Sequence, residues 1–240
     1  MDTNFPAALP HGPLEEVFPD IFIVTGRFKM APLVTITRNM IVVREGRSLT
    51  LMNSVRLSEA GEAELARLGT VERLIKLGPF HGIDDPYTVH RFRPTLYALP
   101  KARHGLGITT DVELTAASLP LADAELFTFE ATQHAEAAIL VHRHGGVLLT
   151  CDSVQNNVTL KRLTPLAKVG ALAMGFRCKA GIGKPWRKAM AMPGGPPLSA
   201  EFERLLSLPF RHLISAHGPP LRETAREDLR ATVTRLWPER

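Results

Sequence analysis

Side chains that bind metal ions follow four apolar, strand-like runs of this sequence. They are imidazoles and carboxylates, and the runs that precede them span residues 71–77, 125–130, 137–151 and 211–215. The five candidate ligands are His81, Asp85, His134, Asp152 and His217. Because α/β proteins place their chemistry at the carboxyl ends of strands, we expect the five to meet in one pocket. Imidazole and carboxylate ligands suit zinc and also iron or manganese, so the sequence predicts a metal site.

The order of these residues resembles that of the metallo-β-lactamase-fold hydrolases. Members of that family have a strand followed by His-x-His-x-Asp-His, then a further His, a Gly-Asp after a strand, and a late Ala-His-Gly. The matching blocks here are His81-Gly82-Ile83-Asp84-Asp85-Pro86, Gln133-His134-Ala135, Cys151-Asp152 and Ala216-His217-Gly218. The resemblance covers roughly residues 17 to 220. It implies the family's architecture, a four-layer αββα sandwich with the site along one edge.

The resemblance also implies two ligand sets that share Asp152. The first set adds His81 and His134, and the second adds Asp85 and His217. Two imidazoles with one carboxylate suit zinc or non-haem iron. The second set is more anionic, and it suits manganese or magnesium better.

Two positions of the family motif carry side chains that cannot bind a metal ion. Ile83 and Pro86 stand where the family has its second and third His, so each of the two ions would lack one ligand. We therefore expect one divalent ion, zinc or else iron or manganese, and none if the site is degenerate. We also expect Ile83 and Pro86 to line the pocket and make one wall apolar. Asp84 could replace Asp85 by a shift of one residue.

Hydrolysis is the chemistry that the resemblance implies at such a site. A divalent ion lowers the pKa of a bound water toward about 7, and the resulting hydroxide attacks the substrate. We expect a mononuclear metal-dependent hydrolase of a small anionic ester, thioester, lactone or phosphoester. Asp85 and Asp152 are the candidate catalytic carboxylates, because a carboxylate can orient the water or accept its proton. The alternative is a metal-free or non-hydrolytic member of the fold that binds a small molecule or a protein.

A cationic segment is the candidate substrate-binding region. Residues 177–197 contain five Lys or Arg side chains and one Trp between clusters of Gly and Pro, which predicts a loop at the rim of the site. From this loop we expect Lys184, Trp186 and Arg187 to contact a carboxylate or phosphate of the substrate. His90 and His104 are further candidates, since both could reach the same edge.

Composition narrows the other classes of function. The net charge of +5 suits an anionic ligand. Nucleic acid is a less favoured partner, because only 6% of the residues are aromatic and basic residues are not interleaved with them. No apolar run approaches the roughly 18 residues of a membrane helix. We find no secretory signal and no cysteine pattern that predicts a disulfide framework. We expect Cys151 to be buried in the core as a small hydrophobic residue. We expect a cytoplasmic protein with a small-molecule substrate, and the sequence leaves its oligomeric state open.

Strands and helices must alternate to position these side chains. The expected strands are 21–24, 33–37, 40–44, 48–52, 71–77, 94–99, 125–130, 137–151 and 211–215, with a hairpin turn at 144–146 in the long one. The expected helices are 58–68, 160–175, 199–207 and 225–237. Ser58 can cap the first of these helices, and Gly69 can end it.

The strand-rich opening of the chain decides between two α/β (α+β) architectures. About four strands precede the first helix, which favours the αββα sandwich over a doubly wound sheet. Gly-rich phosphate loops and a Gly-x-Ser-x-Gly elbow are absent from the sequence. We expect residues 1–16, with their three prolines, to form an irregular arm, and residues 17–240 to form a single domain.

Overall fold

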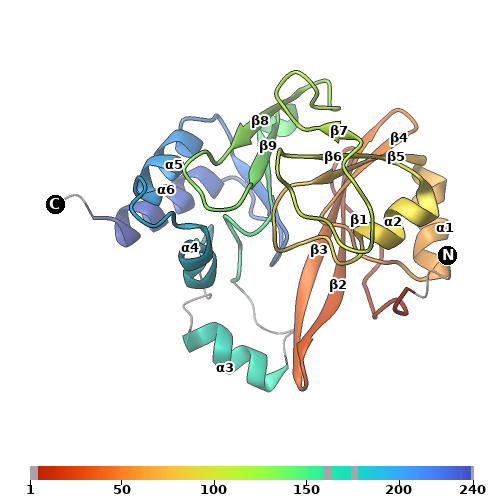
Figure 1. Ribbon diagram of the computed structural model, residues 1–240, viewed down its shortest axis with the longest axis horizontal. Coiled ribbons are helices and arrows are strands. Elements are labelled where there is room, and N and C mark those ends of the chain that lie inside the picture. Colours follow the sequence, from red (N-terminus) through yellow and green to blue (C-terminus); the bar gives the residue numbers. More distant parts are fainter. Residues whose placement is uncertain (1–4, 159–163, 174–177, 239–240) are drawn as a thin grey trace.

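Two β-sheets lie face to face in the computed structural model, with helices on their outer sides (Figure 1). The structure describes residues 5–158, 164–173 and 178–238. Apolar side chains of both sheets form the central core between them, among them Ile23, Ile41, Ile75, Ile139 and Leu149. The expected four-layer αββα sandwich is confirmed.

The first sheet has seven strands in sequence order. They are β1 (Glu15–Phe18), β2 (Ile21–Ala31), β3 (Val34–Glu45), β4 (Ser48–Met52), β5 (Thr70–Lys76), β6 (Thr95–Ala98) and β7 (Val112–Glu113). The pairs from β1 to β4 are antiparallel, and those from β4 to β7 are parallel. The two short strands expected at 33–37 and 40–44 are one continuous strand, β3.

The second sheet has four strands in the order β11-β10-β9-β8. They are β8 (Ala124–Thr128), β9 (Ala137–Val141), β10 (Val147–Thr150) and β11 (His212–Ser215). A short 3₁₀ turn, Arg143–Gly145, joins β9 to β10, so the expected hairpin forms. Because β10 and β11 run parallel, with Thr150 opposite Ser215, their carboxyl ends lie side by side.

Helices cover both outer faces. Along the seven-stranded sheet lie α1 (Glu59–Leu68) and α2 (Asp85–Phe92), and along the four-stranded sheet lie α4 (Lys184–Met190), α5 (Leu198–Leu206) and α6 (Ala225–Leu236). The Ser58 side chain caps α1 by accepting from the N–H of Gly61 at 3.3 Å, as the sequence predicts. Within the described residues, no helix is long and apolar enough to cross a lipid bilayer.

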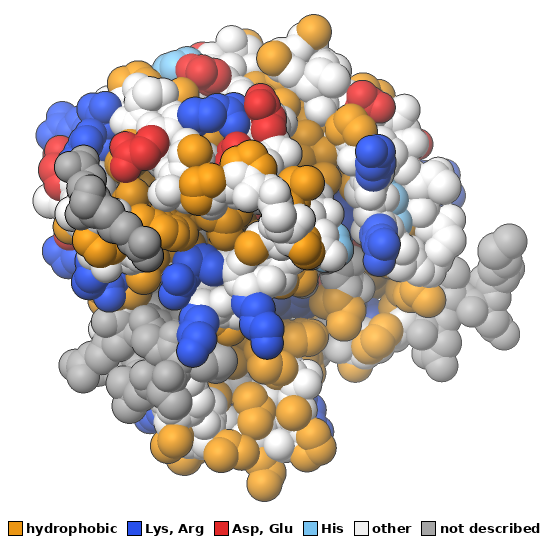
Figure 2. All heavy atoms as spheres, turned by 60° about the vertical axis from the view of Figure 1, so that its left-hand side comes forward, with side chains coloured by type: hydrophobic (Ala, Val, Ile, Leu, Met, Phe, Trp, Pro, Cys, Tyr) orange, Lys and Arg blue, Asp and Glu red, His pale blue; other side chains and the backbone are white. Residues whose placement is uncertain are grey.

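A further helix, α3 (Pro165–Ala173), lies beside the β2–β3 hairpin (Figure 1). The Thr164 hydroxyl donates to the carbonyl of Leu33 at 2.9 Å, which ties the start of α3 to the hairpin tip. Apolar side chains gather at this end of the molecule, which is the lower end in Figure 2. Met30, Leu33, Leu166 and Val169 are all exposed there.

Three segments differ from the expected elements. Strand β1 begins at Glu15, inside the range expected to be an irregular arm, and His11 forms a bridge with Gly26. Residues 85–92, where no helix was expected, form α2, and residues 184–190, expected as part of a rim loop, form α4. Both helices carry a proline in the first turn, where a proline is well tolerated because the missing N–H has no partner to lose.

Candidate metal centre

Three of the five expected ligands meet at one edge of the sandwich. His81 Nε2 lies 3.2 Å from His217 Nε2 and 3.4 Å from Asp152 Oδ2. His217 Nε2 lies 3.2 Å from Asp152 Oδ1. In the part of the chain that the structure describes, this is the one group of three or more side chains arranged to hold a metal ion. All three side chains are largely buried.

The two sheets contribute these ligands separately. His81 follows β5 of the seven-stranded sheet, whereas Asp152 and His217 follow β10 and β11 of the four-stranded sheet. The N–H of Ala137 donates to the carbonyl of Leu77 at 2.7 Å, which fixes the end of β5 against the second sheet. A metal ion at this point would therefore be held across the interface between the sheets.

Hydrogen bonds orient the ligand side chains. His217 Nδ1 lies 2.7 Å from the carbonyl oxygen of Thr37, so we assign the proton of the neutral ring to Nδ1 and the free lone pair to Nε2. Asp152 Oδ1 accepts from the Gln155 amide at 2.8 Å. Partners of this kind commonly fix the tautomer and rotamer of metal-binding side chains.

The charges within the group support one another. Burial alone would raise the pKa of Asp152, but the charge of His81 and the hydrogen bond from His217 hold this pKa well below its usual range. Burial alone would lower the pKa of His217, and the hydrogen bond and charge of Asp152 raise it above its ordinary value. Asp152 is therefore an ionised carboxylate, the form that binds a metal ion.

The spacing of the three donor atoms fits a metal ion. Zinc bound tetrahedrally with bonds of 2.0–2.1 Å holds its ligand atoms about 3.3 Å apart. The observed separations among His81, Asp152 and His217 are 3.2 to 3.4 Å. Two imidazoles and one carboxylate with open positions are also the donor set of catalytic zinc and non-haem iron sites.

Comparison with known proteins identifies the fold. No protein-family model matches the sequence, and no curated protein sequence is detectably similar to it. Solved structures of metallo-β-lactamases do match. The DIM-1 enzyme is 12% identical, with 96% of this chain and 100% of that chain covered at a TM-score of 0.63. This chain has the metallo-β-lactamase fold.

Two further structures show the same likeness to the metallo-β-lactamase fold. The FIM-1 enzyme from Pseudomonas aeruginosa, in a mono-zinc form, is 12% identical, with 96% of this chain and 98% of that chain covered at a TM-score of 0.60. The metallo-β-lactamase from Erythrobacter litoralis is 12% identical, with 92% of each chain covered at a TM-score of 0.58. At such identity, the likeness shows the fold.

Asp85 does not join the group, which corrects the expectation that it is a ligand and a catalytic carboxylate. It is the first residue of α2 and is buried. Its Oδ1 accepts from the Ser54 hydroxyl, and its Oδ2 lies 3.6 Å from Lys76 Nζ. Lys76 Nζ also donates to the carbonyl of His81. A buried lysine thus stands as the counter-ion of Asp85.

Asp84 does not replace Asp85 at the site. Its carboxylate forms an ion pair with Arg38 and accepts from the N–H of Arg56 at 2.7 Å. Both acids that could have served a second metal ion are therefore paired with protein cations.

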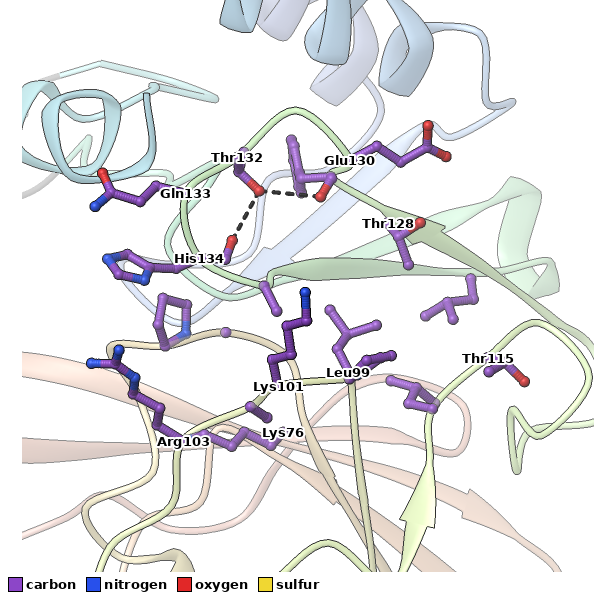
Figure 3. Close-up of a pocket in the computed structure, with 18 of the residues that line it drawn as sticks. Lys76, Leu99, Lys101, Arg103, Thr115, Thr128, Glu130, Thr132, Gln133 and His134 are labelled. Carbon is purple, nitrogen blue, oxygen red and sulfur yellow. Dashed lines mark hydrogen bonds between the residues drawn. The ribbon is translucent and has the colours of Figure 1, made fainter. Parts of the chain in front are cut away.

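His134 also stands apart from the group, so the expected set of His81, His134 and Asp152 does not form. Its ring is half-buried in the loop after β8, with its centroid 6.4 Å from that of Phe80. The Thr132 hydroxyl donates to the His134 carbonyl at 2.8 Å and shapes this loop (Figure 3). His134 lines a neighbouring cleft instead.

The two residues in place of the family's histidines do not narrow a pocket. Ile83 is 60% exposed, and Pro86 is buried in the first turn of α2. Because the chain turns into a helix at Asp85, these two side chains point to different surroundings. The prediction that they form an apolar wall of the site is wrong.

The expected cationic rim is a helix whose aromatic residue belongs to the core. Trp186 is 4% exposed, and its Nε1 donates to Glu136 Oε2 at 2.7 Å. The guanidinium of Arg187 lies 5.9 Å from the Trp237 ring, and Lys184 is exposed at the start of α4. Trp186 therefore cannot cover a substrate. Arg177, the first cation of the expected loop, lies outside the described residues.

The remaining candidates also lie apart from the metal group. His90 is exposed on α2, where its ring centroid lies 5.4 Å from that of Phe5. His104 Nε2 lies 2.8 Å from the Thr110 hydroxyl, and burial lowers the pKa of its ring. Burial raises the pKa of the Cys151 thiol well above its ordinary value, so this residue is no nucleophile.

Glu136 supports the site and was missed by the sequence analysis. It is fully buried directly before β9, and its Oε1 accepts from the N–H of Ser153 at 2.7 Å. Its Oε2 accepts the hydrogen bond from Trp186 Nε1. Glu136 therefore links the turn after Asp152 to α4. Burial raises the pKa of Glu136 to about 8. A lone acid beside the wholly apolar β9 was the one signal in the sequence.

A cleft of about 880 Å³ adjoins the metal group. Its lining includes Gly78, Pro79 and Phe80, which directly precede His81, and also His134, whose ring contacts that of Phe80. Figure 3 shows Arg103 at the same end of the cleft as His134, Lys101 near the middle beside Leu99, and Thr115 and Thr128 at the other end. The volume lies in the range of small-molecule sites.

Proposed function

We propose that this protein is a hydrolase that works with one divalent metal ion, zinc or else iron or manganese. His81, Asp152 and His217 would hold the ion, and a small anionic ester, thioester, lactone or phosphoester would be the substrate. The proposal rests on the three donor atoms 3.2 to 3.4 Å apart at the edge of a metallo-β-lactamase fold. A divalent ion supplies a Lewis acid and lowers the pKa of water toward about 7.

Hydrogen bonds within the protein hold the side chains of this site in place before a metal ion binds. The Thr37 carbonyl fixes the His217 ring, and the Gln155 amide fixes the Asp152 carboxylate. Asp152 contributes the negative charge that favours a cation over an anion between the two imidazoles. Burial of the three side chains excludes competing water and strengthens these interactions.

The ion pairs around the site favour one metal ion over two. A second ion would need Asp84 or Asp85, and these bind Arg38 and Lys76. Displacing either cation would leave a buried charge without a partner, which is strongly unfavourable.

Elemental analysis of protein purified without chelators or nickel resin tests the proposal. We expect close to one zinc, iron or manganese per chain, and loss of most of it in His81→Ala and Asp152→Asn. His142→Ala is the matched control, because His142 is exposed and follows the last residue of β9, whereas the metal group lies near the first residue of that strand. Esters, thioesters, lactones and phosphoesters are then assayed with the loaded protein. Metal content that is unchanged in Asp152→Asn would refute the assignment.

A metal-free binding module is the second candidate. The observation that favours it is the pairing of Asp85 with Lys76 and of Asp84 with Arg38, together with the position of His134 apart from the metal group. In that case the protein would remain free of metal after dialysis against zinc, iron and manganese salts, yet would still bind a ligand in its cleft.

A further inference from the structure

The cleft beside the metal group carries unpaired positive charge. In the part of the chain that the structure describes, the side chains of Lys101 and Arg103 have no hydrogen-bond or ion-pair partner. Both are exposed, and Arg103 lies at the His134 end of the cleft while Lys101 lies near its middle (Figure 3). Many other cations of this protein are paired, such as Arg73 with Glu45 and Arg143 with Asp123.

No acid in the cleft neutralises these two cations. Glu130 is the one carboxylate in its lining; it forms an ion pair with Arg204 at 3.1 Å, and its side chain points away from the cavity in Figure 3. Lys76, deeper in the lining, is already balanced by Asp85. The cleft therefore carries a net positive charge from its middle to its His134 end.

The backbone holds Lys101 in an uncommon conformation. Its φ is +64°, in the left-handed region that glycine and asparagine normally occupy. A lysine in this position costs conformational energy, and such outliers gather at functional sites. The strained turn after β6 aims the Lys101 side chain across the cleft (Figure 3).

Apolar side chains form much of the rest of the cleft wall, beside the hydroxyls of Thr115 and Thr128. Leu99, Leu114, Leu126 and Phe129 line it, and Phe80, 51% exposed, stands at its rim. A cleft with a largely apolar wall and two unpaired cations matches a molecule that has an apolar body and one anionic group.

We propose that this cleft binds an amphipathic anion, with its carboxylate or phosphate on Lys101 and Arg103 and its apolar body along the leucine-lined wall. This deepens the proposed function and rests on it in one respect: the cleft ligand is the substrate class of the neighbouring metal site. The subsite differs from the α4 cations Lys184 and Arg187 that the sequence indicated.

Calorimetry on the metal-free full chain tests the subsite without relying on the metal. The probes are octyl phosphate, neutral octyl glucoside and inorganic phosphate, in chelator-treated protein. We expect octyl phosphate to bind at least tenfold more tightly than either other probe, a difference of about 1.4 kcal/mol or more. Its affinity should fall as salt is raised, because exposed charges are screened.

The decisive variant is Lys101→Gly with Arg103→Ala. Glycine suits a φ of +64°, so this variant should keep or raise its Tm while losing both cations. We expect at least a tenfold loss of octyl phosphate affinity and no change for octyl glucoside. The matched control, Arg67→Ala with Arg230→Ala, removes two exposed helix cations away from the cleft and should bind like the parent.

Two outcomes would overturn the inference. One is that the parent and the cleft variant bind octyl phosphate with equal affinity. The other is that the control variant loses as much octyl phosphate affinity as the cleft variant. The variant Lys184→Ala with Lys188→Ala is measured separately. A tenfold loss of octyl phosphate affinity in this variant alone would show that the anion binds at α4 and not in the cleft. Failure to bind metal would refute the proposed function and leave this measurement unaffected.

Discussion

Glu136 illustrates how much one buried side chain contributes to the site. Each of its carboxylate oxygens accepts one N–H, from Ser153 and from Trp186. Both oxygens of a carboxyl group keep lone pairs even when it is protonated, whereas an amide offers a single acceptor oxygen, so Glu136→Gln would leave one buried N–H unpaired, at a cost of about 1–3 kcal/mol. We expect urea unfolding at pH 5 to show this loss. Glu130→Gln, which alters an exposed ion pair, should change stability by less than about 0.5 kcal/mol.

The same residue predicts a pH dependence. Burial raises the pKa of Glu136 from 4.5 to about 8, so between these values the folded state binds more protons than the unfolded state. Its contribution to the free energy of unfolding is therefore fully present below pH 4.5 and declines as the pH rises to about 8. We expect the stability gap between the parent and Glu136→Gln to narrow over this range. A gap that widens would contradict the assignment.

Lys76 and Asp85 form the other buried pair on which the site depends. Lys76→Met would leave Asp85 charged and without its counter-ion, which costs roughly 3–5 kcal/mol. In Lys76→Met with Asp85→Asn, the buried charge is gone as well. We expect this double variant to recover most of the loss in urea unfolding. Simple additivity of the two single changes would show that the two side chains do not interact.

At the scale of elements, the loop after β11 must pass very close to the turn after β10. Gly218 has a φ of +84°, and a Cβ there would overlap the backbone carbonyl oxygen of Asn156. Gly218→Ala therefore combines a clash with strain, and we expect it to cost more than about 2 kcal/mol and to reduce metal content.

Two control glycines separate clash from strain in that experiment. Gly194 has a φ of +69° with nothing within 4 Å, so Gly194→Ala reports strain alone. Gly105 has open space and no positive φ, so Gly105→Ala should change stability by less than about 1 kcal/mol. If Gly218→Ala proves no worse than Gly194→Ala, the close approach to Asn156 is not the reason for the glycine.

Most strands could be predicted from the sequence, because apolar runs and turn residues are local signals. The same placement at strand ends predicted that His81, Asp152 and His217 lie close together, as they do. Asp85 could not be excluded in this way, since nothing in the spacing shows that Lys76 Nζ reaches back to it. For α4, the glycines and prolines concealed a helix that Pro185 in its first turn indicated.

At the scale of the whole molecule, metal binding should stabilise both sheets together. Because the ligands come from both sheets, a metal ion that binds only the folded state raises the free energy of unfolding, by about 4 kcal/mol at a thousandfold excess over its Kd. We expect a single thermal transition that shifts upward with metal and downward with chelator. Asp152→Asn should lack the shift. Two separate transitions would show that the sheets unfold independently.

The division of the three candidate ligands between the sheets also has a mechanical consequence. Figure 1 shows α1 and α6 on opposite sides of the sandwich, each packed on a different sheet. A force that pulls these two helices apart would act across the sheet interface and hence on His81 against Asp152 and His217. A bound ion would resist this separation. The force needed to pull the two sheets apart would therefore be higher with the ion bound than without it.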